Sequence, residues 1–303
     1  MTRPVLPARL PDQSGRTWFI TGATSGLGRE AARAASRAGA RLIVPARNPE
    51  KARALLQELP GPARTLPLDL GDLASVRAAA VLIDELIDEP IDILLNNAGR
   101  VTMRREQNAA GHELILATNL LGPFAFTNLI ADRVRQRIVI VGSSAHRVGH
   151  VDGHDPHFRR RRWSAARAYS QAKLGDMLWA VELYRRLRAA GRDLTVQLAH
   201  PGWALTGIQN VSASQRLNRV FTRVSGIMSQ PAEVGALPIL MAATADLPPL
   251  SYCGPDGLGE QRGAPTLVGR AWRALDPQAA RAVWELCVRD TGTDLPMPSA
   301  GED

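Results

Sequence analysis

The chain has 303 residues, of which 45% are hydrophobic and 22% are charged. These fractions are ordinary for a globular protein and exclude a largely disordered chain. Two cysteines are too few for a disulfide framework, and the sequence has no continuous run of about 20 apolar residues. We therefore expect a cytoplasmic protein without an integral membrane segment.

The formal net charge of +8 is compatible with binding to nucleic acid or to an anionic membrane surface, and residues 159–162 are four consecutive arginines. Lys51 and Lys173 are the only lysines among 37 basic residues, so a general preference for arginine explains much of this charge. No zinc-ligand spacing or RNA-binding signature accompanies the run. We expect no nucleic-acid partner and no metal site, and we interpret residues 159–162 as a solvated loop.

Short apolar runs recur along the chain, and segments with helical spacing lie between most of them. The runs are Thr17–Thr21, Arg41–Val44, Thr65–Leu68, Ile91–Leu95, Arg137–Val141 and Leu194–Leu198. This alternation is typical of a doubly wound α/β fold, with a parallel sheet and helices on both faces. We expect a single domain over residues 13–290, with flexible ends at 1–12 and 291–303.

A glycine-rich turn follows the first expected strand. Gly22, Gly26 and Gly28 are spaced Gly-x3-Gly-x-Gly, before an alanine-rich helical segment at residues 29–38. Glycines allow the backbone to turn tightly and approach a pyrophosphate, which then lies at the positive end of the helix. A purely structural turn is the alternative, because this spacing differs from the Gly-x-Gly-x2-Gly fingerprint.

Tyr169 and Lys173 stand four residues apart in an expected helix that runs to about residue 190. Residues at this spacing share a helix face, so the ammonium can approach the phenol and favour the phenolate needed for acid/base catalysis. The alternative is a pair of surface neighbours. A lysine in a chain that otherwise uses arginine favours catalysis, since it indicates that a compact head with three donors is needed there.

With these motifs, the chain resembles the short-chain dehydrogenase/reductase family over about residues 14–270, which implies a Rossmann-type fold. The other matching segments are Asp69-Leu70, Asn96-Asn97-Ala98-Gly99, Asn119, Gly142-Ser143-Ser144 and Pro201-Gly202-x3-Thr206. Within the family it is most similar to the retinol-dehydrogenase-like branch. The patterns that carry this similarity are Ala46-Arg47-Asn48, Gly111-His112-Glu113, Ser144-Ala145-His146 and His200-Pro201-Gly202-Trp203. Pro123 and the basic loop at residues 100–105 depart from the usual pattern and leave the substrate open.

The resemblance implies an enzyme that interconverts an alcohol and a carbonyl. Ser143, with Ser144 as the alternative, would hold the substrate oxygen, and Tyr169 would transfer the proton. Lys173 would polarise Tyr169 and hold the ribose, while Asn119 would anchor a water. The implied cofactor-binding residues are Gly22, Thr24, Ser25, Gly26, Leu27, Gly28, Arg47, Asp69, Leu70, Asn96, Ala98, Gly99, Tyr169, Lys173, Pro201, Gly202 and Thr206.

The end of the second strand predicts a preference for NADP(H), with NAD(H) as a possible second cofactor. An acidic residue there would bind the adenosine ribose of NAD and repel a 2′-phosphate, but this position is Ala46. Arg47 follows and can pair with the phosphate. The alternative is that Arg47 is an exposed residue at a helix start.

The segment at residues 203–230 is expected to form a lid over a lipophilic site, because it is rich in apolar residues. These include Trp203, Leu205, Ile208, Val211, Leu217, Val220, Phe221 and Ile227. Packing on the sheet is the alternative. For His146 and His200 we expect packed, hydrogen-bonded side chains, and for the tryptophans core or lid positions.

The resemblance also implies a homodimer or homotetramer, with the helices carrying Asn119 and Tyr169 at the interface. A second functional class is a non-catalytic dinucleotide-binding sensor or scaffold. The presence of Ser143, Tyr169 and Lys173 together argues against it, because a protein without catalysis has no need for all three.

Overall fold

The computed structural model describes residues 10–202 and 230–296, which form one eight-stranded sheet in the order β3-β2-β1-β4-β5-β6-β7-β8. The strands are β1 (Thr17–Ile20), β2 (Arg41–Ile43), β3 (Ala63–Arg64), β4 (Ile91–Asn96), β5 (Val134–Val141), β6 (Thr195–Ala199), β7 (Tyr252–Pro255) and β8 (Pro265–Leu267). Neighbours are parallel except β7 and β8, which pair antiparallel. The strand order reverses between β1 and β4, and such a switch point opens a ligand crevice at the carboxyl ends of the strands.

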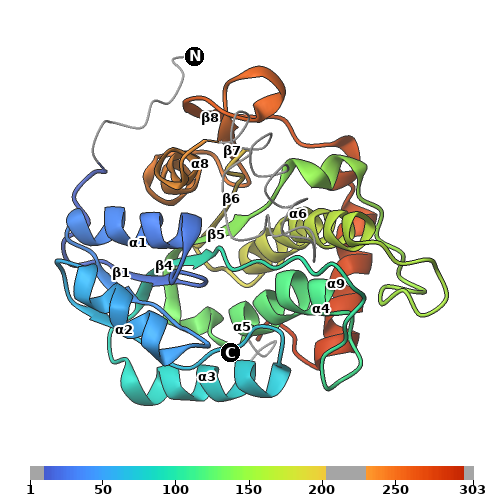
Figure 1. The fold of residues 1–303 in the computed structure, drawn as a ribbon, viewed down its shortest axis with the longest axis horizontal. Coiled ribbons are helices and arrows are strands. Elements are labelled where there is room, and N and C mark those ends of the chain that lie inside the picture. Colours follow the sequence, from blue (N-terminus) through green and yellow to red (C-terminus); the bar gives the residue numbers. More distant parts are fainter. Residues whose placement is uncertain (1–9, 203–229, 297–303) are drawn as a thin grey trace, which may run out of the picture.

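Helices cover both faces of this sheet, as the sequence predicted. The longer ones are α1 (Gly26–Arg37), α2 (Pro49–Glu58), α3 (Leu73–Leu86), α5 (Gly122–Leu129), α6 (Ala165–Ala189), α8 (Ala232–Thr244) and α9 (Pro277–Thr291). The shorter turns are α4 (Leu114–Leu116), η1 (Ala117–Leu121), η2 (Ala131–Arg133), η3 (Ser144–Val148), η5 (Leu258–Glu260) and η6 (Trp272–Leu275). Figure 1 shows α1 and α8 on one side of the sheet and α3 and α5 on the other.

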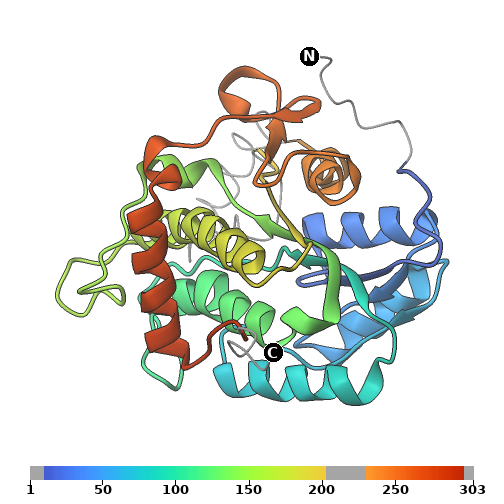
Figure 2. The same ribbon diagram turned by 180° about the vertical axis from the view of Figure 1, so that it is seen from behind.

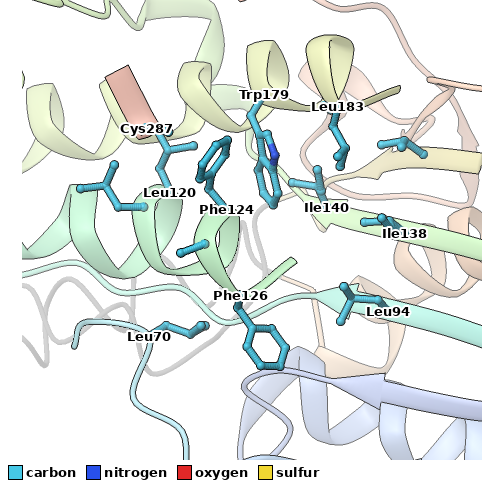
Figure 3. Packing of buried hydrophobic residues seen from close by; sticks show 14 of the residues in the cluster. Leu70, Leu94, Leu120, Phe124, Phe126, Ile138, Ile140, Trp179, Leu183 and Cys287 are labelled. Atoms are coloured by element: carbon cyan, nitrogen blue, oxygen red, sulfur yellow. The ribbon is translucent and has the colours of Figure 1, made fainter. Parts of the chain in front are cut away.

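Each face of the sheet has its own hydrophobic core, because successive strand residues point to opposite sides. Trp18 and Ile20 of β1 pack with alanines of α1 and with Ile239 of α8, whereas Phe19 lies in the other core. In that second core, Phe124 of α5 meets Trp179 of α6 at 6.1 Å between ring centroids (Figure 3). The doubly wound arrangement therefore follows from the alternation along each strand.

Two parts of the sheet differ from the sequence-based prediction. The third strand covers Ala63–Arg64 and not Thr65–Leu68, and beyond it only an isolated bridge joins Ala46 to Pro67. Between the strand and this bridge, Thr65 Oγ1 donates to the Val44 carbonyl at 2.9 Å and takes the place of a backbone bond, which explains the early end of the strand. The pair β7 and β8 was not predicted, because these short segments contain glycine and proline, which are unfavourable in strands.

The outermost helix, α9, lies against α5 and α6 (Figure 2). Residues Gly122–Asn128 of α5 are buried within the chain. We expected a partner subunit on this face, where α9 of the same chain packs on both helices; the oligomeric state stays a prediction. The ordered part also extends beyond residue 290, because Leu295 is buried and Asp294 accepts a hydrogen bond from Trp284 Nε1 at 2.9 Å.

Candidate active site

A cavity of about 450 Å³ opens at the carboxyl ends of β1, β2 and β4. Its walls come from the glycine turn, the ends of β2 and β4, and the loop before α3. The lining residues are Thr21, Gly22, Thr24, Ser25, Gly26, Leu27, Gly28, Pro45, Ala46, Arg47, Leu68, Asp69, Leu70, Asn97, Ala98, Gly99, Arg100, Val101 and Thr118. Most of the residues expected to bind the cofactor therefore surround one cavity.

The glycine turn is held in place by the loop that follows β4. Thr21 Oγ1 accepts hydrogen bonds from the backbone N–H groups of Asn97 and Ala98, both at 3.0 Å. The side-chain amide of Asn97 in turn donates a hydrogen bond to the Thr21 carbonyl at 2.9 Å. Two loops about 75 residues apart in sequence thus form one rigid cradle.

Glycine is required at two places in this cradle. Gly22 has a φ of +68°, which side-chain-bearing residues rarely adopt. A Cβ at Gly28 would lie 2.4 Å from both the Gly22 carbonyl oxygen and Asn97 Nδ2. The first turn of α1 therefore lies in direct contact with the cradle.

The amino end of α1 offers unpaired donors to the cavity. Its N-cap, Ser25, makes no side-chain cap hydrogen bond, and the first turn contains no acidic residue. The first amides of a helix lack partners within the helix, so this end is suited to an anion such as a pyrophosphate.

At the end of β2, Arg47 is exposed and lines the cavity wall. Its Nη1 lies 3.8 Å from Asp69 Oδ2, which is a long distance for an ion pair, and both side chains are exposed. Asp69 is itself oriented by the N–H of Gly71, which donates to Oδ1 at 2.9 Å. A weak, exposed pair of this kind leaves the guanidinium able to turn toward a ligand.

The residues present fit a dinucleotide. Besides the open helix terminus, Thr118 lines the cavity and has a buried hydroxyl without a hydrogen-bond partner among the described residues. A buried, unpaired hydroxyl is costly, so a ligand atom or a water is expected there. Thr118 was not predicted from the sequence, and its place directly before Asn119 is the signal that could have indicated it.

Tyr169 and Lys173 lie one turn apart in α6, near the end of β5. Lys173 Nζ is 5.9 Å from the centre of the Tyr169 ring and donates to the Val141 carbonyl of β5 at 2.8 Å. Ser143 follows β5 by two residues and caps η3, with its Oγ accepting from Ala145 N–H at 3.2 Å. Ser143 is half-buried, whereas Ser144 is exposed.

Close packing brings η3 against α6. A Cβ at Gly149 would lie 2.3 Å from the carbonyl oxygen of Ser170, so this glycine allows the two backbones to touch. Because Ser143 precedes η3 and Tyr169 precedes Ser170, the contact sets the separation between the two expected catalytic side chains.

Asn119 lies in η1, a single π-helical turn, and such turns are frequent at functional sites. Its side chain is fully engaged with the backbone of Arg100, accepting from the N–H at 2.7 Å and donating to the carbonyl at 2.9 Å. The side chain therefore anchors the loop after β4 to the helix that carries it.

The match to the family model for short chain dehydrogenases covers residues 16–217, two thirds of the chain. The chain belongs to the short-chain dehydrogenase/reductase family. It is therefore an oxidoreductase that acts on CH–OH donors with NAD(P), and it lies in the retinol-dehydrogenase-like branch.

Three similar proteins illustrate this. Human retinol dehydrogenase 13 is 32% identical, covering 93% of this chain and 86% of its own length. Mouse polyprenol dehydrogenase is 33% identical, covering 94% of this chain and 87% of its own length. A crystal structure of an uncharacterized protein from Mycobacterium Paratuberculosis has a TM-score of 0.82 and 37% identity, covering 98% of this chain and 100% of that one.

Two histidines of this chain support the loops that flank the expected catalytic residues. His146 contacts the Ser143 carbonyl through Nδ1 at 2.7 Å and accepts from Ala271 N–H at 3.1 Å. His200 accepts from Gly202 N–H at 3.2 Å and contacts Glu260 at 3.1 Å. Both side chains are buried and hydrogen-bonded, in agreement with their predicted packed roles.

Burial lowers the pKa of His146, and it lowers the pKa of His200 to about 4 although Glu260 opposes the shift. Both rings are therefore neutral near pH 7. The contact between His200 and Glu260 is then a hydrogen bond and not an ion pair.

The arginine run at residues 159–162 is part of a loop organised by a buried carboxylate. Asp155 accepts hydrogen bonds from the backbone N–H groups of Arg159, Arg160 and Arg161 at 2.7, 3.1 and 2.8 Å. Arg161 also donates to Gln171 of α6 at 3.0 Å. The run is thus a tight loop docked on α6.

Some expected residues lie outside the cavity. Asn96 Nδ2 donates to Thr127 of α5 at 2.9 Å, so its side chain is used within the fold. Ser143, Tyr169, Lys173, Pro201 and Gly202 are not among the lining residues. Thr206 and nearly all of the expected lid, at residues 203–229, lie outside the described residues. No described helix is both long and apolar enough to cross a membrane.

Proposed function

We propose that this protein is an NADP(H)-dependent oxidoreductase that interconverts an alcohol with a ketone or aldehyde of a lipophilic compound, with Tyr169 as the general acid/base. The observation that carries the proposal is the placement of Lys173. Its ammonium is buried beside the Tyr169 ring, at the end of the strand that leads to Ser143.

When bound, the cofactor supplies or accepts a hydride at its nicotinamide ring. Side chains of this protein bind the substrate oxygen and transfer the proton. Ser143 donates a hydrogen bond to the substrate oxygen, and Tyr169 gives a proton to that oxygen in reduction and takes it in oxidation. Lys173 favours the phenolate by its charge, and two of its three donors are already fixed, which leaves one for a ribose hydroxyl.

The preference for NADP(H) rests on Ala46 and Arg47. Ala46 presents no carboxylate to repel a 2′-phosphate, and Arg47 is an exposed cation on the same wall of the cavity. A charge-assisted hydrogen bond of this kind contributes about 1.5–3 kcal/mol, which corresponds to roughly a 10- to 100-fold preference.

The lipophilic substrate is supported by the sequence of residues 203–230 and by the names of two relatives, a retinol dehydrogenase and a polyprenol dehydrogenase. Both names denote alcohols with long apolar chains. An apolar lid would cover such a chain while the alcohol carbon lies at Tyr169.

The test is to follow NADPH oxidation with a panel of carbonyl compounds of matched reactivity and increasing chain length. We expect kcat/KM to rise with apolar length, and to be higher for retinal or a prenyl aldehyde than for a short polar ketone. Activity confined to short polar carbonyls would contradict the lipophilic substrate. The absence of reductase and dehydrogenase activity across the panel, with tight NADPH binding, would favour a dinucleotide sensor.

A further inference from the structure

A second ionisable side chain lies against Lys173 and takes no part in the mechanism above. Asp176 Oδ2 accepts a hydrogen bond from Lys173 Nζ at 2.8 Å. The two side chains are 6% and 2% exposed, so water does not screen the pair. Asp176 lies three residues after Lys173 in α6, and therefore on the same side of the helix.

Other ionisable groups near this carboxylate are neutral around pH 7. Tyr252 of β7 and Cys287 of α9 are both buried, and burial raises the pKa of each well above its ordinary value. On α6 itself, the neighbours are Lys173 and the phenol of Tyr169. In the described part of the chain, Lys173 is thus the cation that balances Asp176.

The pair is ionised at neutral pH. Burial raises the pKa of Asp176 to about 6, although the Lys173 ammonium opposes this shift. Burial also disfavours the Lys173 ammonium, but the Asp176 carboxylate outweighs it, so the pKa of Lys173 is raised. A buried carboxylate that stays charged beside the expected catalytic cation must alter the electric field of that cation.

We infer that Asp176 is a positioning residue that holds Lys173 against β5 and partly cancels its charge at Tyr169. An isolated ammonium acts on the phenol as a full positive charge, whereas the ion pair acts as a dipole whose field falls off faster with distance. Asp176 therefore weakens the electrostatic support that Lys173 gives to a negative charge on the Tyr169 oxygen. The inference deepens the proposed function, because it rests on Tyr169 as the acid/base group.

A weaker support for the phenolate favours proton donation by Tyr169, which carbonyl reduction requires. Alcohol oxidation requires the phenolate and is expected to rise at higher pH. The overall equilibrium is unaffected, since a residue of the enzyme changes the rates of both directions and not the free energies of the reactants.

The test replaces the carboxylate with the neutral amide of the same shape, Asp176→Asn, and uses Asp176→Ser in case the amide does not pack. The matched control is Glu182→Gln, because Glu182 is also a buried carboxylate of α6 but binds Arg185 and Arg186. Asp176→Glu keeps the charge and serves as the conservative variant.

The readout is the ionisation of Tyr169, measured by tyrosinate absorbance against pH with and without NADP⁺. The chain has three tyrosines, so Tyr169→Phe identifies the step that belongs to Tyr169. We expect Asp176→Asn and Asp176→Ser to move that step about one pH unit lower, whereas Glu182→Gln and Asp176→Glu leave it in place. The rising limb of kcat for alcohol oxidation should move by the same amount.

A step that stays in place or moves to higher pH in both neutral variants, with circular dichroism showing a folded protein, would overturn the inference. The outcome is separable from the proposed function, because the absorbance titration requires no substrate. If Tyr169→Phe remains active, the proposed function fails even where the titration shows the expected shift.

Discussion

Trp284 of α9 packs edge-on against Phe124 of α5, with ring centroids 4.8 Å apart and an interplanar angle of 73°. Arg186 of α6 covers the outer face of the same indole, 4.5 Å from its centre. The contact joins α9 to the helices where the family resemblance placed a partner subunit. The chain therefore covers this apolar surface without a second copy.

We predict from this packing that the protein is monomeric at micromolar concentration, with a light-scattering mass near 32.7 kDa. Trp284→Ala should lower the free energy of unfolding by about 3–5 kcal/mol and promote self-association. Trp272→Ala is the control, since that indole is 73% exposed. A dimeric mass for the parent protein would mean that another surface mediates assembly.

Tyr169→Phe should reduce kcat by about 10²–10⁴ while leaving the affinity for NADPH within about threefold, because the hydroxyl acts in the transition state. Single-turnover kinetics and a fluorescence titration measure the two quantities. Tyr184→Phe, which changes a half-buried tyrosine of the same helix, should leave both unchanged. A kcat within tenfold of the parent would exclude Tyr169 as the acid/base group.

The cofactor preference is tested by Ala46→Asp combined with Arg47→Ala. The new carboxylate repels a 2′-phosphate, and the loss of Arg47 removes its partner, so the ratio of kcat/KM for NADPH over NADH should fall by 10-fold or more. Arg53→Ala, an exposed arginine of α2, is the control for a general loss of charge. Equal efficiencies with both cofactors in the parent enzyme would show that Arg47 does not select the phosphate.

Gly28→Ala places a methyl group against the Gly22 carbonyl and the Asn97 side chain. Overpacking of this kind costs about 1–3 kcal/mol, and it should also weaken cofactor binding, because the cradle must move. Urea unfolding and an NADPH titration measure these effects. Gly153→Ala is the matched control, since a Cβ there has no neighbour within 4 Å. An unchanged unfolding free energy and an unchanged NADPH affinity for Gly28→Ala would mean that the cradle accommodates the methyl group without cost.

Asp155 should make the protein sensitive to acid. Burial raises its pKa, but hydrogen bonds from the N–H groups of residues 159–161 outweigh this and bring the pKa to about 2. A lowered pKa means that the stabilisation is present above about pH 4 and is lost as the pH falls toward 2. Asp155→Asn should therefore cost about 2 kcal/mol of unfolding free energy at pH 7, and progressively less below pH 4.

Thermal unfolding across this pH range checks the prediction, with Asp193→Asn, a fully exposed carboxylate, as the control. A difference between Asp155→Asn and the parent that stays constant down to pH 2 would assign the effect to packing and not to the charge.

Local signals in the sequence were enough to predict the parallel sheet and the glycine cradle. The strand runs and the spacing of Gly22, Gly26 and Gly28 are short-range patterns, and each is tied to one backbone geometry. The pairing of Tyr169 with Lys173 was likewise local, since one helical turn joins them.

The remaining features depend on contacts that no local pattern encodes. Asp176 stands three residues from Lys173, but its burial, at 1% exposure, depends on packing between segments distant in the chain, which the sequence does not show. The covering of α5 by Trp284 joins segments about 160 residues apart. β7 and β8 hold glycine and proline, so their pairing is imposed by the neighbouring sheet.

The bonds from Asn97 and Ala98 to Thr21 also connect ligand binding to the order of folding. Because the cradle needs β4 beside β1, it cannot form until a stretch of more than 70 residues has closed, and such long-range closure slows folding. NADPH should therefore bind late on the folding pathway. Since it binds the native state and not the unfolded chain, a concentration 100 times its Kd should add about 2.7 kcal/mol of stability. Early folding intermediates that lack the β1–β4 pair should gain none of it.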